Sequence, residues 1–473
     1  MPDAPHETDQ GAGNASTQDL LRAIAARAAS VSRDPIDLTL GTMHALLSAL
    51  DDPQDNTPPV IHVAGTNGKG STIALLAAIL EAAGKRVHTY TSPWLHTPND
   101  GLMLAQGDGA RTPITESAHA KLLARIHASD LATPPTVFEA QTAAAFLTFS
   151  EHPADIVLLE TGLGGRLDAT NVVAKPLLTI ITPISVDHAE FLGSDVADIA
   201  REKAGILRKG VPVVVARQPD NAFGTIERIA GGLGATLHTA GRDWDAFEQH
   251  GRLVFQNEHS LRDLALPSLA GRYQIENAGV AIAAAGLAMS RLDAAPLPDS
   301  TVERGLANVI WPARLQPLDI SRFPDAELPQ GSEVWLDGGH NADAAIVLAS
   351  ALADMDEASP MPIYLVTAML ASKDPDIFLR PFRGLVRTVA AVPLPERENA
   401  TAAPARRTAI VGAAEANGIE AHAMSGVPGA LEWIARQSAH PARILICGSF
   451  QLAAHVLEIM PDTKKEPGAR TGL

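Results

Sequence analysis

The sequence predicts an α/β protein whose mostly parallel sheets carry helices on both faces. Short apolar runs rich in β-branched residues alternate with Ala-rich helical stretches. A glycine-rich loop separates the first such run from a helix. The chain has 473 residues, which is too many for one compact core. We therefore expect two α/β domains.

The candidate strands fall into two series. The first contains PVIHVAG, KRVHTYTS, ADIVLLETG and LLTIITPIS, and the second, after Trp311, contains EVWLDGG, PIYLVTAM, VRTVAAVPL and ARILICGS. Pro312 and Pro317 interrupt the segment between the series, as in a hinge. We predict an N-terminal domain at residues 18–310 and a C-terminal domain at 311–460, between disordered tails at 1–17 and 461–473.

Composition excludes several classes of protein. The net charge of −17 argues against a general nucleic-acid binder, because phosphate backbones require basic surfaces. No apolar run approaches the ~20 residues needed to cross a membrane, and the polar N-terminus does not resemble a signal peptide. The single Cys447 excludes an intramolecular disulfide framework and lies in an apolar run, as a packed strand residue would. We expect a cytoplasmic, monomeric enzyme that acts on small molecules.

The glycine-rich loop IHVAGTNGKGST has a shorter spacing than the familiar G-x-x-x-x-G-K-[ST] phosphate loop. It still follows an apolar strand and precedes a helical run, so its backbone N–H groups can face phosphate oxygens. The helix N-terminus adds positive potential, and the lysine can reach the outer phosphates. The alternative is a plain glycine turn with a solvated lysine. The context favours ATP binding by Gly65, Thr66, Asn67, Gly68, Lys69, Gly70 and Ser71.

Polar residues follow three further strands of the first series. Ser92 follows the second strand, Glu160 ends the third, and Asp187-His188 follows the fourth. Ligands gather at the carboxyl ends of strands in such sheets. Beside a phosphate loop, Glu160 indicates a magnesium ligand, with Ser92 and His188 as further ligands. The alternatives are a salt-bridged strand end for Glu160 and a structural role for His188, because imidazole is a less usual ligand for a hard cation.

A lysine interrupts the apolar face of the helix predicted in SDVADIAREKAGIL. Val196, Ile199, Ala200 and Leu207 share one face at helical spacing, and Lys203 lies on the same face. A charged lysine there is costly unless it is paired or modified. It either extends its ammonium group to water or is desolvated, with a lowered pKa that lets its amine do chemistry.

Several blocks of the chain resemble, in order, those of folylpolyglutamate synthases and dihydrofolate synthases, within the Mur-ligase-like group of ATP-dependent amide ligases. These blocks are GTNGKGST, TSPWL, FEAQTAAAF, ETGLGGRLDATN, SVDHAEFLG, REKAGI, WPARLQ, LDGGHN and CGSF. The resemblance runs from about Ile36 to Ile459. It implies a P-loop, Mur-ligase-like central domain with a mostly parallel sheet and a smaller Rossmann-like C-terminal domain. It also implies ATP and two magnesium ions.

The resemblance implies roles for individual residues. Lys69, Lys203 and His188 would be catalytic, with Lys203 matching a lysine that the family carries as a carbamate. Ser92, Glu160 and His188 would bind magnesium. The loop from Gly65 to Ser71 would bind ATP together with Asn277, Arg314, Asp337 and His340. The pterin or folate would contact Asp37, Leu38, Thr39, Thr136, Phe138, Glu139, Leu167, Asp168 and Ala169.

The implied activity is ATP-dependent ligation of L-glutamate through an acyl phosphate. The acceptors would be the carboxylate of dihydropteroate, giving dihydrofolate, and the γ-carboxylate of reduced folates. Alternatives are a monofunctional folylpolyglutamate synthase, another Mur-like amide ligase, or a P-loop ATPase without ligase activity. The chain departs from its relatives at Trp94 and the following loop, at Tyr273, where many carry histidine, and at Ala342.

Overall fold

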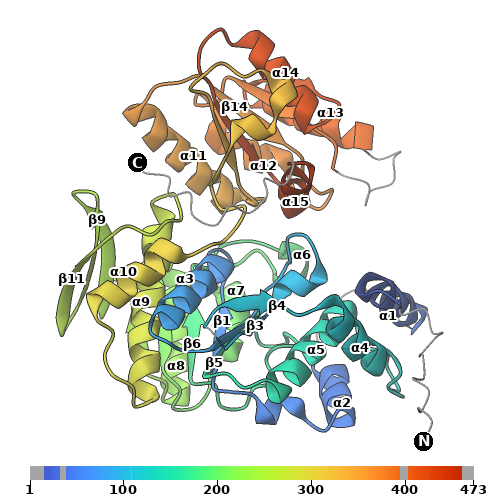
Figure 1. Cartoon of the computed structure of the whole chain (residues 1–473), viewed down its shortest axis with the longest axis vertical. Coiled ribbons are helices and arrows are strands. Elements are labelled where there is room, and N and C mark those ends of the chain that lie inside the picture. The colour runs from blue at the N-terminus through green and yellow to red at the C-terminus, as the bar shows by residue number, and fades with distance from the viewer. Residues whose placement is uncertain (1–14, 32–38, 108, 395–402, 461–473) are drawn as a thin grey trace, which may run out of the picture.

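The structure is a computed structural model that describes residues 15–31, 39–107, 109–394 and 403–460. The strands form two groups that are separate in space, one from the N-terminal part of the chain and one from the part after residue 315 (Figure 1). Helices cover both faces of the two large sheets (Figure 1). The α/β class with mostly parallel sheets is confirmed, while the predicted domain limits at residues 310 and 311 stay a prediction.

The N-terminal part contains an eight-stranded sheet in the order β4-β3-β2-β5-β1-β6-β7-β8. Strands β2, β5, β1, β6, β7 and β8 are parallel, and β3 and β4 add an antiparallel edge. The strands are β1 (Val60–Ala64), β2 (Val87–Tyr90), β3 (Leu102–Ala105), β4 (Arg111–Pro113), β5 (Ile156–Glu160), β6 (Leu178–Ile181), β7 (Val213–Val215) and β8 (Leu237–Thr239).

The central strand β1 is buried on both sides because its side chains alternate between two cores. Ile61 and Val63 pack with residues of α3 and α9, whereas Val60 packs with residues of α5 on the other face. In register, Val63 lies beside Glu160 of β5 and Ile180 of β6. The carboxyl ends of these three strands therefore open at one edge of the sheet.

The helices of the N-terminal part have the following bounds. They are α1 (Thr17–Val31), α2 (Gly41–Ala49), α3 (Lys69–Ala82), α4 (Glu116–His127), α5 (Val137–Glu151), α6 (Ala189–Leu192), α7 (Val196–Lys203), α8 (Asp220–Leu233), α9 (Tyr273–Arg291) and α10 (Asp299–Asn308), with 3-10 turns η1 (Pro53–Asn56), η2 (Pro98–Gly101) and η3 (Ala204–Ile206). A three-stranded antiparallel sheet lies beside α9 and α10 (Figure 1). It consists of β9 (Trp244–Gln249), β10 (Arg252–Asn257) and β11 (Ser260–Leu264).

The C-terminal part contains a six-stranded sheet in the order β12-β13-β17-β14-β15-β16, in which only β12 is antiparallel to its neighbour among the described strands. The strands are β12 (Gln316–Leu318), β13 (Glu333–Leu336), β14 (Ile363–Thr367), β15 (Thr388–Ala391), β16 (Glu420–Ala423) and β17 (Arg443–Cys447). The helices are α11 (Ala342–Ala358), α12 (Pro375–Leu379), α13 (Ala403–Ala416), α14 (Val427–Gln437) and α15 (Phe450–Ile459), with 3-10 turns η4 (Ile320–Arg322), η5 (Pro324–Ala326) and η6 (Arg380–Phe382).

Two sequence predictions need correction. The predicted disordered tail at residues 1–17 is too long, because Thr17 is buried as the first residue of α1; residues 1–14 and 461–473 lie outside the described residues. The predicted helix around Lys203 is too long, because α7 ends at Lys203 and η3 follows. At this turn Gly205 approaches Arg166 so closely that a Cβ would lie 2.5 Å from the Arg166 Cα. Within the described ranges, no helix has the length and apolarity to cross a membrane.

The close crossing of α10 over α3 depends on the absence of a side chain at Gly305. A Cβ on Gly305 would lie 2.5 Å from the Cα of Ile79 and 2.7 Å from its backbone nitrogen. Gly305→Ala should therefore lower the free energy of unfolding by about 1–3 kcal/mol, the usual cost of overpacking. Urea denaturation measures this change.

Gly286→Ala is the matched control, because Gly286 is exposed on α9 and has open space around its Cα. That substitution should be neutral or stabilise by up to about 1 kcal/mol, the helix propensity of alanine over glycine. Equal unfolding midpoints for the two variants would contradict the close crossing.

Candidate active site

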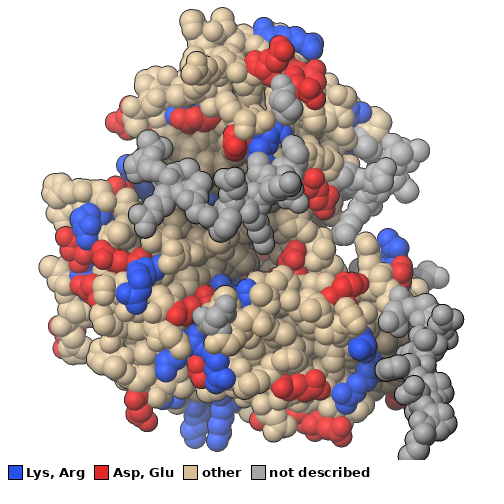
Figure 2. Space-filling view, in the orientation of Figure 1, with Lys and Arg blue, Asp and Glu red and all other residues tan. Residues whose placement is uncertain are grey.

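A cavity of about 390 Å³ lies between the carboxyl ends of the two large sheets. Its wall combines the loop after β1, the ends of β2, β5 and β6, the N-terminus of α9, and the connection from β13 to α11. Figure 2 shows the molecule hollowed between the upper and lower groups of elements seen in Figure 1. Segments more than 250 residues apart in sequence thus face one another across one space.

The glycine-rich loop from Gly65 to Ser71 lines this cavity throughout. Thr66 ties the loop to the segment after β6, because its hydroxyl donates to the Ser185 carbonyl at 3.0 Å and accepts the Ser185 N–H at 3.1 Å. Helix α3 begins at Lys69, so the first N–H groups of the helix have no partner within it. A helix N-terminus of this kind can bind a phosphate group.

Lys69, Glu160 and Ser92 meet at the floor of the cavity. The Lys69 Nζ lies 3.7 Å from Glu160 Oε1, and Glu160 Oε2 accepts the Ser92 N–H at 3.3 Å. Burial raises the pKa of Glu160 to about 7, against the opposing charge of Lys69. The Ser92 Oγ is buried and has no hydrogen-bond partner among the described residues. Two buried oxygen ligands, one of them without a partner, fit a hard cation such as magnesium.

His188 lines the same cavity, but its side chain is largely exposed. The described residues contain no cluster of three or more His, Cys, Asp and Glu side chains that could hold a metal. A magnesium site here would therefore combine Ser92 and Glu160 with phosphate oxygens of a bound nucleotide. The structure places Ser92 and Glu160 in contact, and the role of His188 as a ligand stays a prediction.

Lys203 is buried, with 5% of its surface exposed, and its Nζ donates to the Gly65 carbonyl at 2.8 Å. The alternative that its ammonium group reaches water is therefore wrong. Burial lowers the pKa of Lys203 to about 7; the charge of Lys69 adds to this effect, and the carboxylates of Asp187 and Asp168 oppose it. The lysine at the end of α7 thus supports the phosphate loop from behind and has a large neutral fraction near pH 7.

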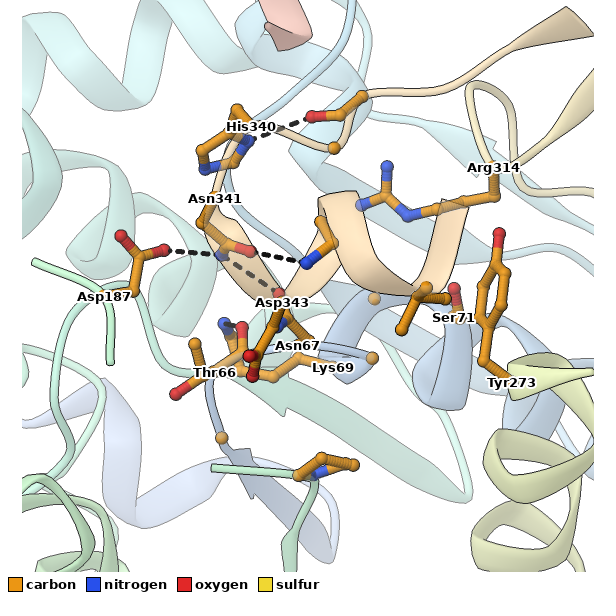
Figure 3. Close-up of a pocket in the computed structure, with 18 of the residues that line it drawn as sticks. Thr66, Asn67, Lys69, Ser71, Asp187, Tyr273, Arg314, His340, Asn341 and Asp343 are labelled. Atoms are coloured by element: carbon orange, nitrogen blue, oxygen red, sulfur yellow. Dashed lines mark hydrogen bonds between the residues drawn. The ribbon is translucent and has the colours of Figure 1, made fainter. Parts of the chain in front are cut away.

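The C-terminal part supplies Arg314, Asp337 and His340 to the opposite wall. Figure 3 shows Arg314 and His340 at this wall. Arg314 lies over the ring of Phe450, with its Cζ 4.6 Å from the ring centroid. Asp337 accepts the N–H groups of Leu315 at 2.7 Å and Gly339 at 2.6 Å, so it stabilises the turns beside it. Among the described residues, Arg314 and Asp337 do not form a direct ion pair with each other.

Two predicted nucleotide contacts are neutral groups. Burial lowers the pKa of His340 to about 4, and its Nδ1 lies 2.9 Å from the Gly338 carbonyl, so the ring is neutral at pH 7. The amide of Asn277 donates to Gln274 at 2.9 Å. Asn277 also lies against Gly68, where a Cβ would be 2.5 Å from its Oδ1.

The structure adds a hydrogen-bonded bridge that the sequence analysis missed. The Nδ2 of Asn341 donates to Asp187 Oδ2 at 2.9 Å and to Asn67 Oδ1 at 3.2 Å (Figure 3). Lys373 pairs with Asp187 Oδ1 at 2.6 Å. Burial alone would raise the pKa of Asp187, but the Lys373 and Asn341 hydrogen bonds outweigh burial and lower it strongly. The block LDGGHN contained a signal for Asn341, whereas nothing in the sequence indicated Lys373.

The described residues among those predicted to contact a pterin or folate do not line this cavity. Asp37 and Leu38 are outside the described residues, and none of the described members of this set lines the cavity. Thr136 and Glu139 form the capping box of α5, with the Thr136 N–H donated to Glu139 Oε2 at 2.8 Å. The other described members are Thr39, Phe138, Leu167, Asp168 and Ala169.

Asp168 stabilises the backbone of the loop that follows β5. It is buried and accepts the N–H groups of Leu163 at 2.8 Å and Thr170 at 3.0 Å. Phe138 packs against Gly162, where a Cβ would lie 2.4 Å from its ring. These contacts shape the loop after β5, which does line the cavity, so the pterin role of the set stays a prediction.

Comparisons with known proteins agree with this geometry. A family model for the Mur ligase middle domain matches residues 63–285. The dihydrofolate synthase/folylpolyglutamate synthase of Bacillus subtilis (strain 168) is 35% identical over 324 residues, which cover 66% of this chain and 71% of that protein. The Escherichia coli (strain K12) protein of the same name is 32% identical over 414 residues, covering 87% and 88%.

The similarity also holds in three dimensions. A crystal structure of a bifunctional folylpolyglutamate synthase/dihydrofolate synthase with Mn, AMPPNP and L-glutamate bound superposes with a TM-score of 0.77. It is 30% identical in sequence and covers 94% of this chain and 99% of its own. The chain therefore belongs to the dihydrofolate synthase/folylpolyglutamate synthase family of ATP-dependent ligases.

Proposed function

We propose that this protein joins L-glutamate to the carboxylate of dihydropteroate and to the γ-carboxylate of reduced folates, and that each ligation converts one ATP to ADP and phosphate. The observation that carries the proposal is the cavity in which a phosphate loop faces Arg314 and two buried oxygen ligands. The names of the Bacillus subtilis and Escherichia coli relatives support both activities. A monofunctional folylpolyglutamate synthase and another Mur-like amide ligase remain as alternatives.

A carboxylate does not react with an amine at neutral pH, so it is first activated by phosphorylation. A carboxylate oxygen attacks the γ-phosphorus of ATP, the bond to the β-γ bridging oxygen breaks, and ADP leaves. The amine of glutamate then attacks the acyl carbon, phosphate leaves, and the amine loses a proton. Lys69 and Arg314 supply positive charge from the two walls, and positioning does most of the work.

The metal site proposed here consists of Ser92, Glu160 and His188. A bound magnesium ion would supply positive charge to the phosphate oxygens. The Mn and AMPPNP in the similar crystal structure support a divalent cation together with a nucleotide. The partnerless Ser92 Oγ beside Glu160 supports the same assignment.

An acyl phosphate is hydrolysed if water reaches it, so the site must be covered during the reaction. The bridge from Asn341 to Asn67 and Asp187 holds the connection between β13 and α11 over the phosphate loop. We infer that this bridge belongs to the closed form in which phosphoryl transfer occurs.

We also propose that the two domains divide between residues 310 and 311, and that the protein is monomeric and located in the cytoplasm.

Lys203 is proposed to react with carbon dioxide and carry a carbamate. Only a neutral amine captures carbon dioxide, and a pKa near 7 gives a neutral fraction about a thousandfold larger than that of an ordinary lysine at pH 7. The ammonium group first loses one proton; the neutral amine then attacks the carbon of carbon dioxide and releases a second proton, so that a cation becomes an anion with two protons lost in all. An anion at the end of α7 would offset the positive charge of Lys69.

Substrate choice can be tested directly. Purified protein with Mg-ATP and L-glutamate should release ADP when dihydropteroate is added and, in a separate reaction, when tetrahydrofolate is added. Turnover with tetrahydrofolate alone would restrict the protein to polyglutamylation. ATP hydrolysis that ignores glutamate and both pterins would instead indicate an ATPase, and the ligase proposal would fail.

Removal of the Lys203 amine tests the second proposal. Lys203→Ala should lower kcat for ligation by about a hundredfold, the usual effect of removing one stabilising group, and change ATP affinity far less. With labelled bicarbonate, wild-type protein should show a carbamate carbon signal by NMR that the variant lacks. Lys209→Ala is the matched control, because Lys209 is exposed on the following turn. Near-normal turnover of Lys203→Ala would rule out a role for the carbamate in ligation, and absence of the carbamate signal in wild-type protein would rule out the carbamate itself.

A further inference from the structure

The loop that follows β2 contacts both parts of the molecule. It runs over residues 91–97, between β2 and η2, and contains Ser92. Leu95 of this loop is half-buried and packs against an apolar core formed by residues of β13, β14, β17, α14 and α15. As far as the structure describes this core, all its other members are residues 313 or later. One side chain of the N-terminal part thus packs in the core of the C-terminal part.

The residue before Leu95 is held on the opposite side. Trp94 lines a small pocket of the N-terminal part together with Tyr90, His119 and Gln141. Trp94 is also one of the positions at which the chain departs from its relatives. Two adjacent side chains therefore join this loop to different parts of the molecule.

The N-terminal part alone holds Ser92 weakly. The Ser92 N–H donates to Glu160 at 3.3 Å, longer than the usual N–H···O distance of about 2.9–3.0 Å. The Ser92 Oγ has no hydrogen-bond partner among the described residues. The start of the loop is fixed better, because the Thr91 N–H donates to the Gly101 carbonyl at 2.9 Å. The position of the Ser92 hydroxyl therefore depends on what holds the loop beyond Ser92.

The loop that carries His188 has a contact of the same kind. Asp187 binds Asn341 and Lys373 of the C-terminal part, and its Oδ1 also accepts the His188 N–H at 2.8 Å. Glu160, in contrast, is a buried residue of the strand β5. Two of the three candidate metal ligands thus lie on loops that the C-terminal part contacts, and the third lies on the rigid sheet.

We propose that Leu95 is a positioning residue, which sets the Ser92 hydroxyl at the metal site by packing in the core of the C-terminal part. The inference rests on the proposed function, because it concerns the metal and the nucleotide of that reaction. A metal ligand binds more tightly when contacts outside the metal shell fix its orientation. Approach of the C-terminal part and binding of the metal-nucleotide complex are then linked, so each favours the other.

Leu95→Ala removes the side chain that packs in the C-terminal core and leaves Ser92 in place. Isothermal titration of the full-length protein with Mn-AMPPNP should give a Kd raised about tenfold, as expected when a group that orients a metal ligand is lost. The Kd for AMPPNP in EDTA should stay unchanged, because Ser92 binds the metal alone. In a Ser92→Ala protein, the further change Leu95→Ala should have no effect on the Kd for Mn-AMPPNP, because the group that it positions is absent.

Leu457→Ala is the matched control. Leu457 of α15 is half-buried and packs against the same core as Leu95, but it does not line the cavity. Both alanine variants should lower the thermal midpoint by similar amounts, and only Leu95→Ala should weaken binding of Mn-AMPPNP. Leu95→Met keeps an apolar side chain of similar volume, so it should bind Mn-AMPPNP like wild type. If Leu95→Ala does not fold, Leu95→Val should show a smaller change in the same direction.

Three results would overturn the proposal. They are Mn-AMPPNP binding like wild type in the folded Leu95 variants, equal weakening of binding in Leu457→Ala, and equal weakening of AMPPNP binding in EDTA. The second would show a general effect of a damaged core, and the third an effect on the nucleotide itself. Wild-type protein that does not bind AMPPNP with or without Mn would instead remove the proposed function.

Discussion

The active site depends on one side-chain amide that joins the two sheets. The Nδ2 of Asn341 bridges Asn67 of the phosphate loop and Asp187 after β6, while its Oδ1 caps α11 by accepting the Ala344 N–H at 2.9 Å. The N-terminus of α11 is thereby held against the N-terminus of α3. Asp187 also pairs with Lys373, so two residues of the C-terminal part, Asn341 and Lys373, bind the same carboxylate. In the structure this contact closes a cavity that has Lys69 in one wall and Arg314 in the other.

Two buried ionisable groups near this bridge, Glu160 and Lys203, are not fully stabilised in their charged forms by neighbouring protein groups. Glu160 is buried beside Lys69, yet the pKa of Glu160 is raised, because one ion pair at 3.7 Å does not offset the loss of water. Lys203, buried behind the loop, donates to a carbonyl instead of a carboxylate and has a lowered pKa. Buried groups with opposite shifts indicate a functional site more often than a structural one. A nucleotide and a divalent metal ion bound in this cavity would change the charge beside both groups.

The sequence predicted the parts of this arrangement that depend on local pattern. The β1 strand, the loop and the polar strand ends at Ser92 and Glu160 follow from patterns along single segments, whereas the burial of Lys203 was one of two alternatives that the pattern left open. The bridge from Asn341 could not be predicted in this way, because it joins side chains 154 and 274 residues apart. The short strands β9, β10 and β11 were missed because their surfaces are partly polar. Thr136 and Glu139 carry the T-x-x-E spacing of a capping box, which accounts for the hydrogen bonds between them.

The unusual spacing of the phosphate loop has a physical cause in its neighbours. Gly65 has a φ of 152°, and a Cβ there would lie 1.8 Å from the Thr182 hydroxyl after β6. Gly68 faces Asn277 of α9, and Gly70 faces the ring of Trp311, which precedes the C-terminal sheet. The absence of a side chain at each glycine thus allows a different segment to pack against the loop. At Gly70 this segment is the one that contains Trp311 and continues to Arg314. The short loop is adapted to a nucleotide held between two walls, because its own backbone forms the surface on which the second wall packs.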